Sequence, residues 1–400
     1  MRLRSSISSS LLFVLAALVV FAGTEKTWAQ DLVIRASVVY TMDGDPLRPG
    51  AVLIKDGKVV SVSRSITAPE GSRVIDLGDG ALMPGMINGY SEFGIASGGS
   101  ESTDEITPDF KVLSSIDFED RAFKQAVREG STSVCIFPGR NNIVGGRTAV
   151  VKTAGDELAR RVVQENGGMT ISITRDAVSG NRRVSPDTIY MRIPTDRMGL
   201  IYVLRKTLDE AVRKRPPKMA DLNEALEGKI PIYTVGQAYD EVLTAMRIGE
   251  EFSYKTIVVS AQEAYKAAKE LAASQTPVII SPLTSGESAG GGGGRRGGGG
   301  GLAKWNRAGV LHAAGVKFAL SGGSMLEQAR FAVRCGLPEE AALAAITRTP
   351  AEILGISDRV GAIVAGRDAD FVALSGDPLG LTTKINWVMV DGQIQYEEKE

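Results

Sequence analysis

Short runs rich in β-branched residues alternate with helical stretches through the middle of the chain, and this alternation limits the possible folds more than any other feature. The candidate strands are Ser133–Phe137, Ala149–Lys152, Thr170–Thr174, Ile230–Thr234, Thr256–Val259, Pro277–Ile280 and Val316–Leu320. Several of them follow candidate helices, at Phe118–Glu129, Tyr239–Phe252 and Glu263–Ala273. Such alternation predicts an α/β chain with a parallel sheet and crossover helices.

The length of this region favours one particular α/β fold. Residues 83–355 come close to the ~250 residues of a typical barrel, so we expect a (β/α)8 TIM-like barrel there. A doubly wound open sheet is the alternative, although no Gly-x-Gly-x-x-Gly sequence follows an early strand.

Both ends of the chain are also rich in β-strand signals. An Asp-Gly pair lies between hydrophobic runs at Asp56-Gly57 and again at Asp391-Gly392, and this pair is typical of a tight β-hairpin. We therefore expect residues 30–82 and 356–400 to form one small β-sandwich domain built from both termini.

The first 29 residues have the pattern of a secretory signal peptide. Arg2 and Arg4 precede the apolar run Leu11 to Ala22, and Thr27 and Ala29 would occupy the −3 and −1 positions of a cleavage site. An uncleaved membrane anchor is the alternative, but twelve apolar residues are short for a span of ~20. We expect an exported protein, periplasmic or extracellular, with no membrane span after cleavage.

One internal segment has low complexity. Residues 289–301 contain ten glycines around Arg295 and Arg296, a composition that predicts a flexible surface insertion because glycine loses much entropy on ordering.

Composition excludes several classes of function. Lys and Arg total 46 against 47 for Asp and Glu, so a broad basic surface for nucleic acid is absent. Two cysteines, Cys135 and Cys335, cannot supply a disulfide framework or a cysteine zinc cage. The single histidine, His312, excludes any mechanism that needs two imidazoles.

Three segments of the chain carry recognisable motifs: residues 82–92, Leu-Met-Pro-Gly-Met-Ile-Asn-Gly-Tyr-Ser-Glu, residues 336–355, and residues 359–370 with Val390-Asp391-Gly392. Together they resemble the amidohydrolase superfamily, nearest the imidazolonepropionase-like and prolidase-like metal hydrolases. The first segment is similar to the end of that family's first barrel strand, Pro-Gly-hydrophobic-Ile/Val-Asp-x-His-x-His, the second to its last barrel helices, and the third to the return into its β-domain. The resemblance covers nearly the whole chain after residue 30.

The resemblance implies hydrolysis of non-peptide or dipeptide C–N bonds at zinc or another divalent metal, which activates a bound water. Its metal ligands are missing here. Tyr90 and Glu92 occupy the two histidine positions of the first strand, and the positions expected for the other ligands and the catalytic aspartate hold Asn88, Val235, Gln237, Ser260 and Gly323. No metal, catalytic or cofactor role carries over, and we expect no cofactor.

Some residues near the former metal cavity remain candidates for a role. These are Tyr90, Glu92, Gln237, Ser260 and Lys152. Tyr90 and Gln237 would hydrogen-bond each other or a ligand. The resemblance makes Lys152 a candidate for a carboxylated, metal-bridging lysine, and a structural ion pair is the alternative. Glu92, Glu263 and Asp240 would suit an oxygen-only site for Mg²⁺, Ca²⁺ or Mn²⁺, against the alternative of solvated carboxylates.

The remaining two reactive side chains are expected to be structural. His312 lies in a helical stretch, away from the strand ends where barrel chemistry occurs. Cys135 lies within a candidate strand and is expected to be buried.

We therefore expect a non-catalytic or degenerate family member with a scaffold, ligand-binding or partner-subunit role. An active hydrolase of small or cyclic amides, using carboxylate ligands or no metal, is the alternative. The expected partners are a small amide-like ligand and either further copies of the chain or a catalytic homologue.

Overall fold

The chain is a mixed α/β protein. The computed structural model describes residues 31–95, 99–101, 103–179, 193–283 and 305–398. The expected signal peptide and the glycine-rich segment lie outside these ranges. None of the helices within them combines the length and the apolar character that a membrane crossing requires.

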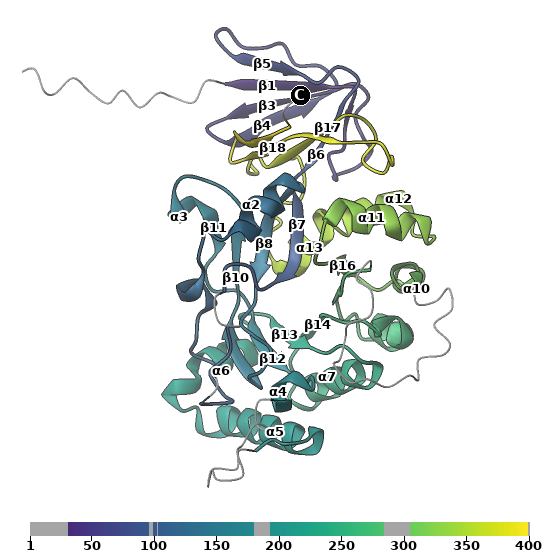
Figure 1. The fold of residues 1–400 in the computed structure, drawn as a ribbon. Helices are drawn as coiled ribbons and strands as arrows, with labels where there is room; N and C mark the ends of the chain where they lie inside the picture. Colours follow the sequence, from purple (N-terminus) through teal and green to yellow (C-terminus); the bar gives the residue numbers. More distant parts are fainter. Residues whose placement is uncertain (1–30, 96–98, 102, 180–192, 284–304, 399–400) are drawn as a thin grey trace, which may run out of the picture.

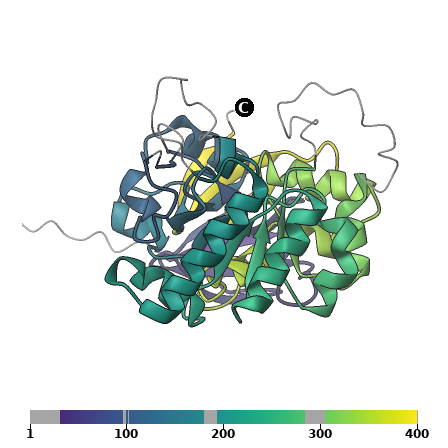
Figure 2. The same ribbon diagram turned by 90° about the horizontal axis from the view of Figure 1, so that it is seen from below.

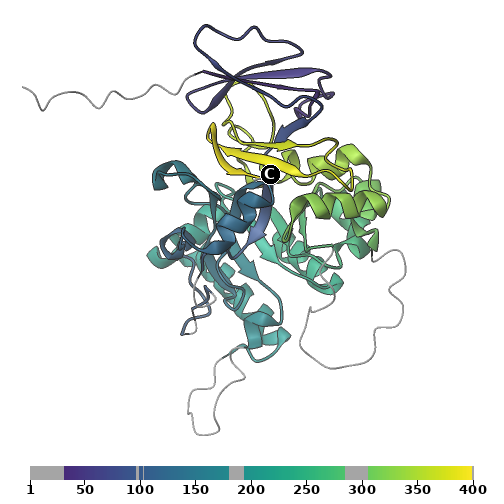
Figure 3. The same ribbon diagram turned by 45° about the horizontal axis from the view of Figure 1, so that its top comes forward.

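Two β-sheets are assembled from the two ends of the chain, and Figures 1 and 3 show the purple N-terminal strands beside the yellow C-terminal ones. One sheet has the order β4-β3-β1-β5 and the other β19-β18-β17-β6-β2. The bounds are β1 Leu32–Ala36, β2 Val38–Val39, β3 Gly50–Lys55, β4 Lys58–Ser63, β5 Arg73–Asp76, β6 Ala81–Pro84, β17 Phe371–Leu374, β18 Ile385–Val390 and β19 Gln393–Glu397.

The two predicted hairpins are confirmed. Asp56 and Gly57 join β3 to β4 with φ of 50° and 75°, and Asp391 and Gly392 join β18 to β19 with φ of 51° and 77°. Two consecutive positive φ angles are what a type I′ turn requires. One cluster of buried side chains is shared by the two sheets, and includes Ile34, Leu82, Phe371 and Trp387.

The middle of the chain forms two further sheets. Their orders are β11-β10-β8-β7 and β16-β15-β14-β13-β12-β9. The bounds are β7 Met86–Ser91, β8 Ser131–Ile136, β9 Val144–Arg147, β10 Ala149–Lys152, β11 Val162–Gln164, β12 Met169–Ser172, β13 Ile232–Val235, β14 Thr256–Val259, β15 Val278–Ile280 and β16 Phe318–Leu320.

These ladders do not form the single closed parallel barrel that the alternation predicts. β10 pairs with β8, and β9 pairs with β12, in the antiparallel sense. Only residues 137–143 connect β8 to β9, and a parallel connection needs a dozen residues or more. Between β7 and β16 the described residues form no ladder, although the Asn88 side-chain oxygen accepts a hydrogen bond from Gly322 N at 3.1 Å.

Helices cover the outer side of the six-stranded sheet, where Figure 2 shows the teal and green helices as an outer layer. The helical segments are η2 Val112–Ser115, α2 Arg121–Arg128, α3 Leu158–Arg161, α4 Asp176–Ser179, α5 Arg197–Lys214, η4 Pro217–Met219, α6 Ala220–Leu226, α7 Tyr239–Glu251, η5 Ala264–Ala267, α8 Ala268–Ala273, α10 Arg307–Ala313, α11 Met325–Arg334, α12 Glu339–Ala344 and α13 Arg348–Leu354.

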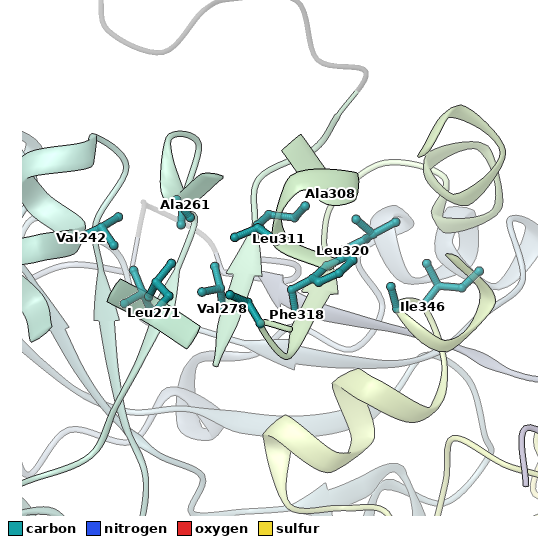
Figure 4. Close-up of a cluster of buried hydrophobic side chains, with 14 of the residues drawn as sticks. Val242, Ala261, Leu271, Val278, Ala308, Leu311, Phe318, Leu320 and Ile346 are labelled. Atoms are coloured by element: carbon teal, nitrogen blue, oxygen red, sulfur yellow. The ribbon is translucent and has the colours of Figure 1, made fainter. Parts of the chain in front are cut away.

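The six-stranded sheet is apolar on both faces. Along β15 and β16, Val278, Ile280, Phe318 and Leu320 belong to the cluster that packs under the helices, as Figure 4 shows with Leu311 of α10. The residues between them in sequence face the other way, and Ile279 and Ala319 join an inner cluster with Tyr233 and Phe137. Period-two alternation with two buried faces explains why these strands appear as continuous hydrophobic runs.

A buried ion cluster joins the central strands to the C-terminal segment. The side chain of Lys152, the last residue of β10, is 0% exposed, and its Nζ lies 2.8 Å from Asp368 Oδ2 and 3.1 Å from Asp370 Oδ1. It also pairs with Asp391 in the β18–β19 hairpin. Burial opposes the charged form of Lys152, but the charges of the three aspartates outweigh it and raise its pKa.

Lys152→Ala is expected to destabilise the protein by about 3–5 kcal/mol, because it leaves buried carboxylates without their cation. Chemical denaturation measures this free energy of unfolding. The control is Lys58→Ala, which removes an exposed partner of Asp368 and is expected to cost about 1 kcal/mol or less. Equal unfolding free energies for Lys152→Ala and the unmodified chain would contradict the role given to this cluster.

Acid is expected to remove the contribution that Asp368 makes to this cluster. Burial alone would raise the pKa of Asp368, but its cationic partners, Lys152 first, bring it down from 3.8 to about 2. A depressed carboxyl pKa contributes stability that is present above the unfolded pKa and is lost as the pH falls through the folded value.

Candidate functional site

The carboxyl ends of the parallel strands, where the family resemblance places the metal site, lie at one edge of the central sheets. β7 runs parallel to β8, and β12 to β16 run parallel to one another. The β9–β10 segment, interrupted only by Thr148, is antiparallel to β8 through β10 and to β12 through β9, so all seven carboxyl ends meet at the same edge. We call this edge the mouth. Tyr90 and Glu92 lie there at the end of β7, Gln237 follows β13, and Ser260 follows β14.

Tyr90 and Glu92 belong to a small polar network at the mouth. The Tyr90 hydroxyl donates to Glu92 Oε1 at 3.4 Å. Arg140 Nε lies 3.8 Å from Glu92 Oε1 and 3.5 Å from Asp176 Oδ2, so a single guanidinium serves two carboxylates. Burial raises the pKa of Glu92 above its usual value, and Arg140 acts in the opposite direction.

A row of aromatic rings in tilted and edge-on contact packs beside Tyr90. The rings of Tyr90 and Phe137 have centroids 4.6 Å apart, and Phe137 and Tyr233 follow at 5.2 Å. Tyr233 is buried, and burial raises the pKa of its phenol well above 10.0. Burial likewise raises the pKa of Tyr90, so its hydroxyl is a neutral donor rather than a phenolate.

Gln237 and Ser260 take part mainly in local structure. Gln237 N donates to Glu241 Oε2 at 2.7 Å, and its carbonyl accepts from Glu263 N at 2.9 Å. Ser260 is 6% exposed, has a φ of 58°, and lies with its Oγ 3.4 Å from Ser281 Oγ. The hydrogen bond predicted as one possibility between Tyr90 and Gln237 is replaced by the bond from Tyr90 to Glu92.

Lys152 lies away from the mouth. It pairs in register with Ser133, and Ser133 pairs with Ile87, whereas the mouth end of β7 is Ser91, which pairs with Ile136. The antiparallel direction of β10 explains this, because it sends the end of that strand toward the terminal sheets. The ion pair with three aspartates agrees with the structural alternative for Lys152.

Each of the three carboxylates considered for an oxygen-only site pairs with a different cation. Glu92 pairs with Arg140, Glu263 with Lys266 at 2.6 Å, and Asp240 with Arg197. Within the described ranges, no group of three or more His, Cys, Asp or Glu residues is placed to hold a metal ion.

The residues at the mouth therefore do not fit the metal that the family resemblance implies. A phenol, an amide and a serine hydroxyl are poor replacements for imidazoles, and the carboxylate of Glu92 already contacts Arg140. His312 is exposed on α10, and Cys135 is buried, which raises the pKa of its thiol to about 12.

Several residues of this site were not predicted. Arg140 and Asp176 were missed, and Phe137 was predicted only as the last residue of a strand, with no role at this site. The position of a residue just after a strand was a usable signal for Arg140, since such positions gather at one edge of a parallel sheet. Asp176 begins α4, which was not predicted at all.

Comparisons with known proteins agree with the resemblance. The model of the amidohydrolase family matches residues 302–396. Amidohydrolase tasK of Hapsidospora irregularis is 23% identical over 401 residues, a match that covers 87% of this chain and 40% of that protein. The chain thus spans less than half of that curated relative.

Solved structures match over nearly the whole chain. An amidohydrolase from Thermotoga maritima MSB8 is 29% identical with a TM-score of 0.79, and the match covers 92% of this chain and 100% of that one. A prolidase solved with N-methylphosphonate-L-proline is 15% identical with a TM-score of 0.56 over 92% of this chain, which is a likeness of fold alone.

The Tyr90 phenol is expected to stay protonated at about pH 10, where an exposed tyrosine is half ionised. Ultraviolet absorbance of folded protein measures the number of phenolates, and Tyr90→Phe should leave that number unchanged. One fewer phenolate in Tyr90→Phe than in the unmodified chain, before unfolding begins, would contradict the neutral hydroxyl.

Proposed function

Because the chain belongs to the amidohydrolase superfamily, we propose that it is an exported member that has lost the metal-binding constellation and binds a ligand or a partner instead of hydrolysing an amide. The observation that carries this proposal is the chemistry of the mouth. Tyr90, Gln237 and Ser260 supply neutral oxygen and nitrogen atoms at positions where the family resemblance implies imidazoles.

The network around Arg140 supports a binding role. Glu92, Asp176 and Arg140 form a partly exposed set of donors and acceptors beside the packed rings of Tyr90 and Phe137. Such a surface offers hydrogen bonds and charge to a polar ligand without a reactive centre. A small amide-like molecule fits this description, since it both donates and accepts hydrogen bonds.

The finer architecture is part of the same proposal. In this proposal the two central sheets together form a (β/α)8-type barrel of residues 83–355, in which the β9–β10 segment replaces one parallel strand. The two terminal sheets represent a β-sandwich of residues 30–82 and 356–400. A crystal structure in which β7 and β16 are hydrogen-bonded strands would support the barrel, and two sheets separated by solvent would contradict it.

Metal analysis of the purified chain tests the main proposal. We expect zinc, iron and manganese each well below one ion per chain after dialysis against a weak chelator. The double variant Tyr90→His/Glu92→His restores two imidazoles and is the control that is able to gain metal. One tightly held ion per unmodified chain would overturn the proposal.

A metal-free hydrolase is the second candidate, favoured by one observation. Burial raises the pKa of Glu92, which has the Tyr90 hydroxyl within reach, and such a carboxyl suits general acid–base catalysis. The same preparation is therefore offered small amides, cyclic amides and dipeptides, and we expect no turnover. Turnover that is lost in Glu92→Gln and kept in the distant Glu352→Gln would favour this hydrolase over the first proposal.

Export and partnership are tested on tagged chain recovered from the cell envelope and medium of its own host. We expect an N-terminus at Gln30 and co-purification of either a second copy of the chain or a catalytically complete homologue. A retained Met1 on chain from the cell envelope would favour the uncleaved anchor, and recovery from the cytoplasm would contradict export. A monomer with no bound protein would contradict the partner role.

A further inference from the structure

Four arginines of the described chain are buried, and three of them have acidic or aromatic partners that account for their burial. Arg147 pairs with Asp221 at 2.9 Å, and Arg330 pairs with Glu327 at 2.6 Å. Arg161 donates through Nε to Lys152 O and lies over the rings of Phe118 and Phe123, with the charge of Glu119 nearby. The fourth is Arg307.

Arg307 is buried without a counter-ion in the part of the chain that the structure describes. It is 7% exposed and donates through one terminal nitrogen to Ser281 O at 3.2 Å and to Pro282 O. Its Nε is buried and has no hydrogen-bond partner. Burial lowers the pKa of the guanidinium, and the Tyr265 phenol opposes this effect. Burying a charged guanidinium without a counter-ion costs folding free energy, and a bound anion would reduce that cost.

The surroundings of Arg307 offer further donors. The carbonyl of Pro282 accepts a hydrogen bond from Arg307. The ring of Pro282 also packs closely against Gly322: a side chain at position 322 would place its Cβ only 2.5 Å from Pro282 Cγ. Gly322, Gly323 and Ser324 lead from β16 into α11, a helix of ten residues. Ser324 makes no side-chain cap, so the first N–H groups of α11 have no side-chain acceptor from the N-cap.

The position of Arg307 is fixed by its helix. The next residue, Ala308, and Leu311 on the same helix pack against the cluster that includes Leu320 of β16, as Figure 4 shows. Arg307 therefore starts α10 at the mouth edge, beside the segments that follow β15 and β16. In barrel folds, the loops after the last two strands together with a helix N-terminus often hold an anion.

We propose that Arg307 and the first turn of α11 form a subsite for an anionic group, a carboxylate or a phosphate, at the mouth ends of β15 and β16. The proposal rests on the binding role given above and specifies its ligand. The ligand would be a small molecule with a negatively charged end at this subsite and polar groups toward Tyr90, Glu92 and Arg140.

Binding of simple anions tests the subsite. Thermal unfolding and calorimetric titration of the full chain are measured with inorganic phosphate or acetate replacing chloride at constant ionic strength. We expect one of the two anions to bind, and Arg307→Met to weaken that binding at least about tenfold. Phosphate alone would identify a phosphate subsite, and acetate a carboxylate subsite.

Two further variants separate binding from folding. Lys317→Met removes an exposed cation just before β16, at the opposite end of the strand, and should leave anion binding unchanged. Arg307→Lys keeps a cation but lacks Nε, and should bind the anion more weakly than the unmodified chain. If Arg307→Met lowers the melting temperature, the comparison is still valid, because the measured quantity is the shift that the anion causes.

Two results would overturn the subsite. One is the absence of any stabilisation by phosphate or acetate, and the other is equal stabilisation of the unmodified chain and Arg307→Met. Neither result bears on metal content, so the loss of the metal centre would stand or fall separately.

Discussion

The way in which the central strands meet the terminal β-sheets depends on one fully buried lysine. Lys152 lies at the end of β10 with no exposed surface, and Asp368, Asp370 and Asp391 surround its ammonium group. Asp368 also pairs with Lys58 and Arg359, each at 2.8 Å. One cluster thus ties the central strands, the β3–β4 hairpin and the C-terminal segment together. Because removal of the buried Lys152 would leave these carboxylates without their cation in a low dielectric, the cluster specifies how these segments meet.

The mouth has the opposite character. Its residues are partly exposed, its one guanidinium between Glu92 and Asp176 is shared at 3.5–3.8 Å, and the rings of Tyr90 and Phe137 pack beside this network. A metal-dependent hydrolase needs an open coordination position above its strands, with imidazoles directed at it. Here the strand ends carry side chains that pack and hydrogen-bond among themselves, which agrees with a binding surface better than with a catalytic centre.

Much of the fold was accessible from the pattern of residues. The Asp-Gly hairpins and seven of the central strands were predicted close to their observed bounds, because turn chemistry and β-branched runs act locally. The direction of the β9–β10 segment was not predicted, since strand direction depends on the connection that precedes the strand. That error also misplaced Lys152, which the sequence put near the former metal cavity. Arg307 was missed because it forms no pattern with its neighbours in sequence. Arg140 was missed although its position shortly after a predicted strand was a usable signal, because its partners Glu92 and Asp176 are distant in sequence.

The sequence by itself determined what chemistry the mouth lacks, because a chain with one histidine has no set of imidazoles to assemble, however it folds. It also determined which segments become strands, through the alternation of side chains that two buried faces require. Only the tertiary structure decided which charges are buried together and which are left alone. Asp368, Asp370 and Asp391 reach Lys152 from more than 200 positions away in sequence, and Arg307 has no carboxylate partner among the described residues, because burial and charge pairing are properties of packed neighbours.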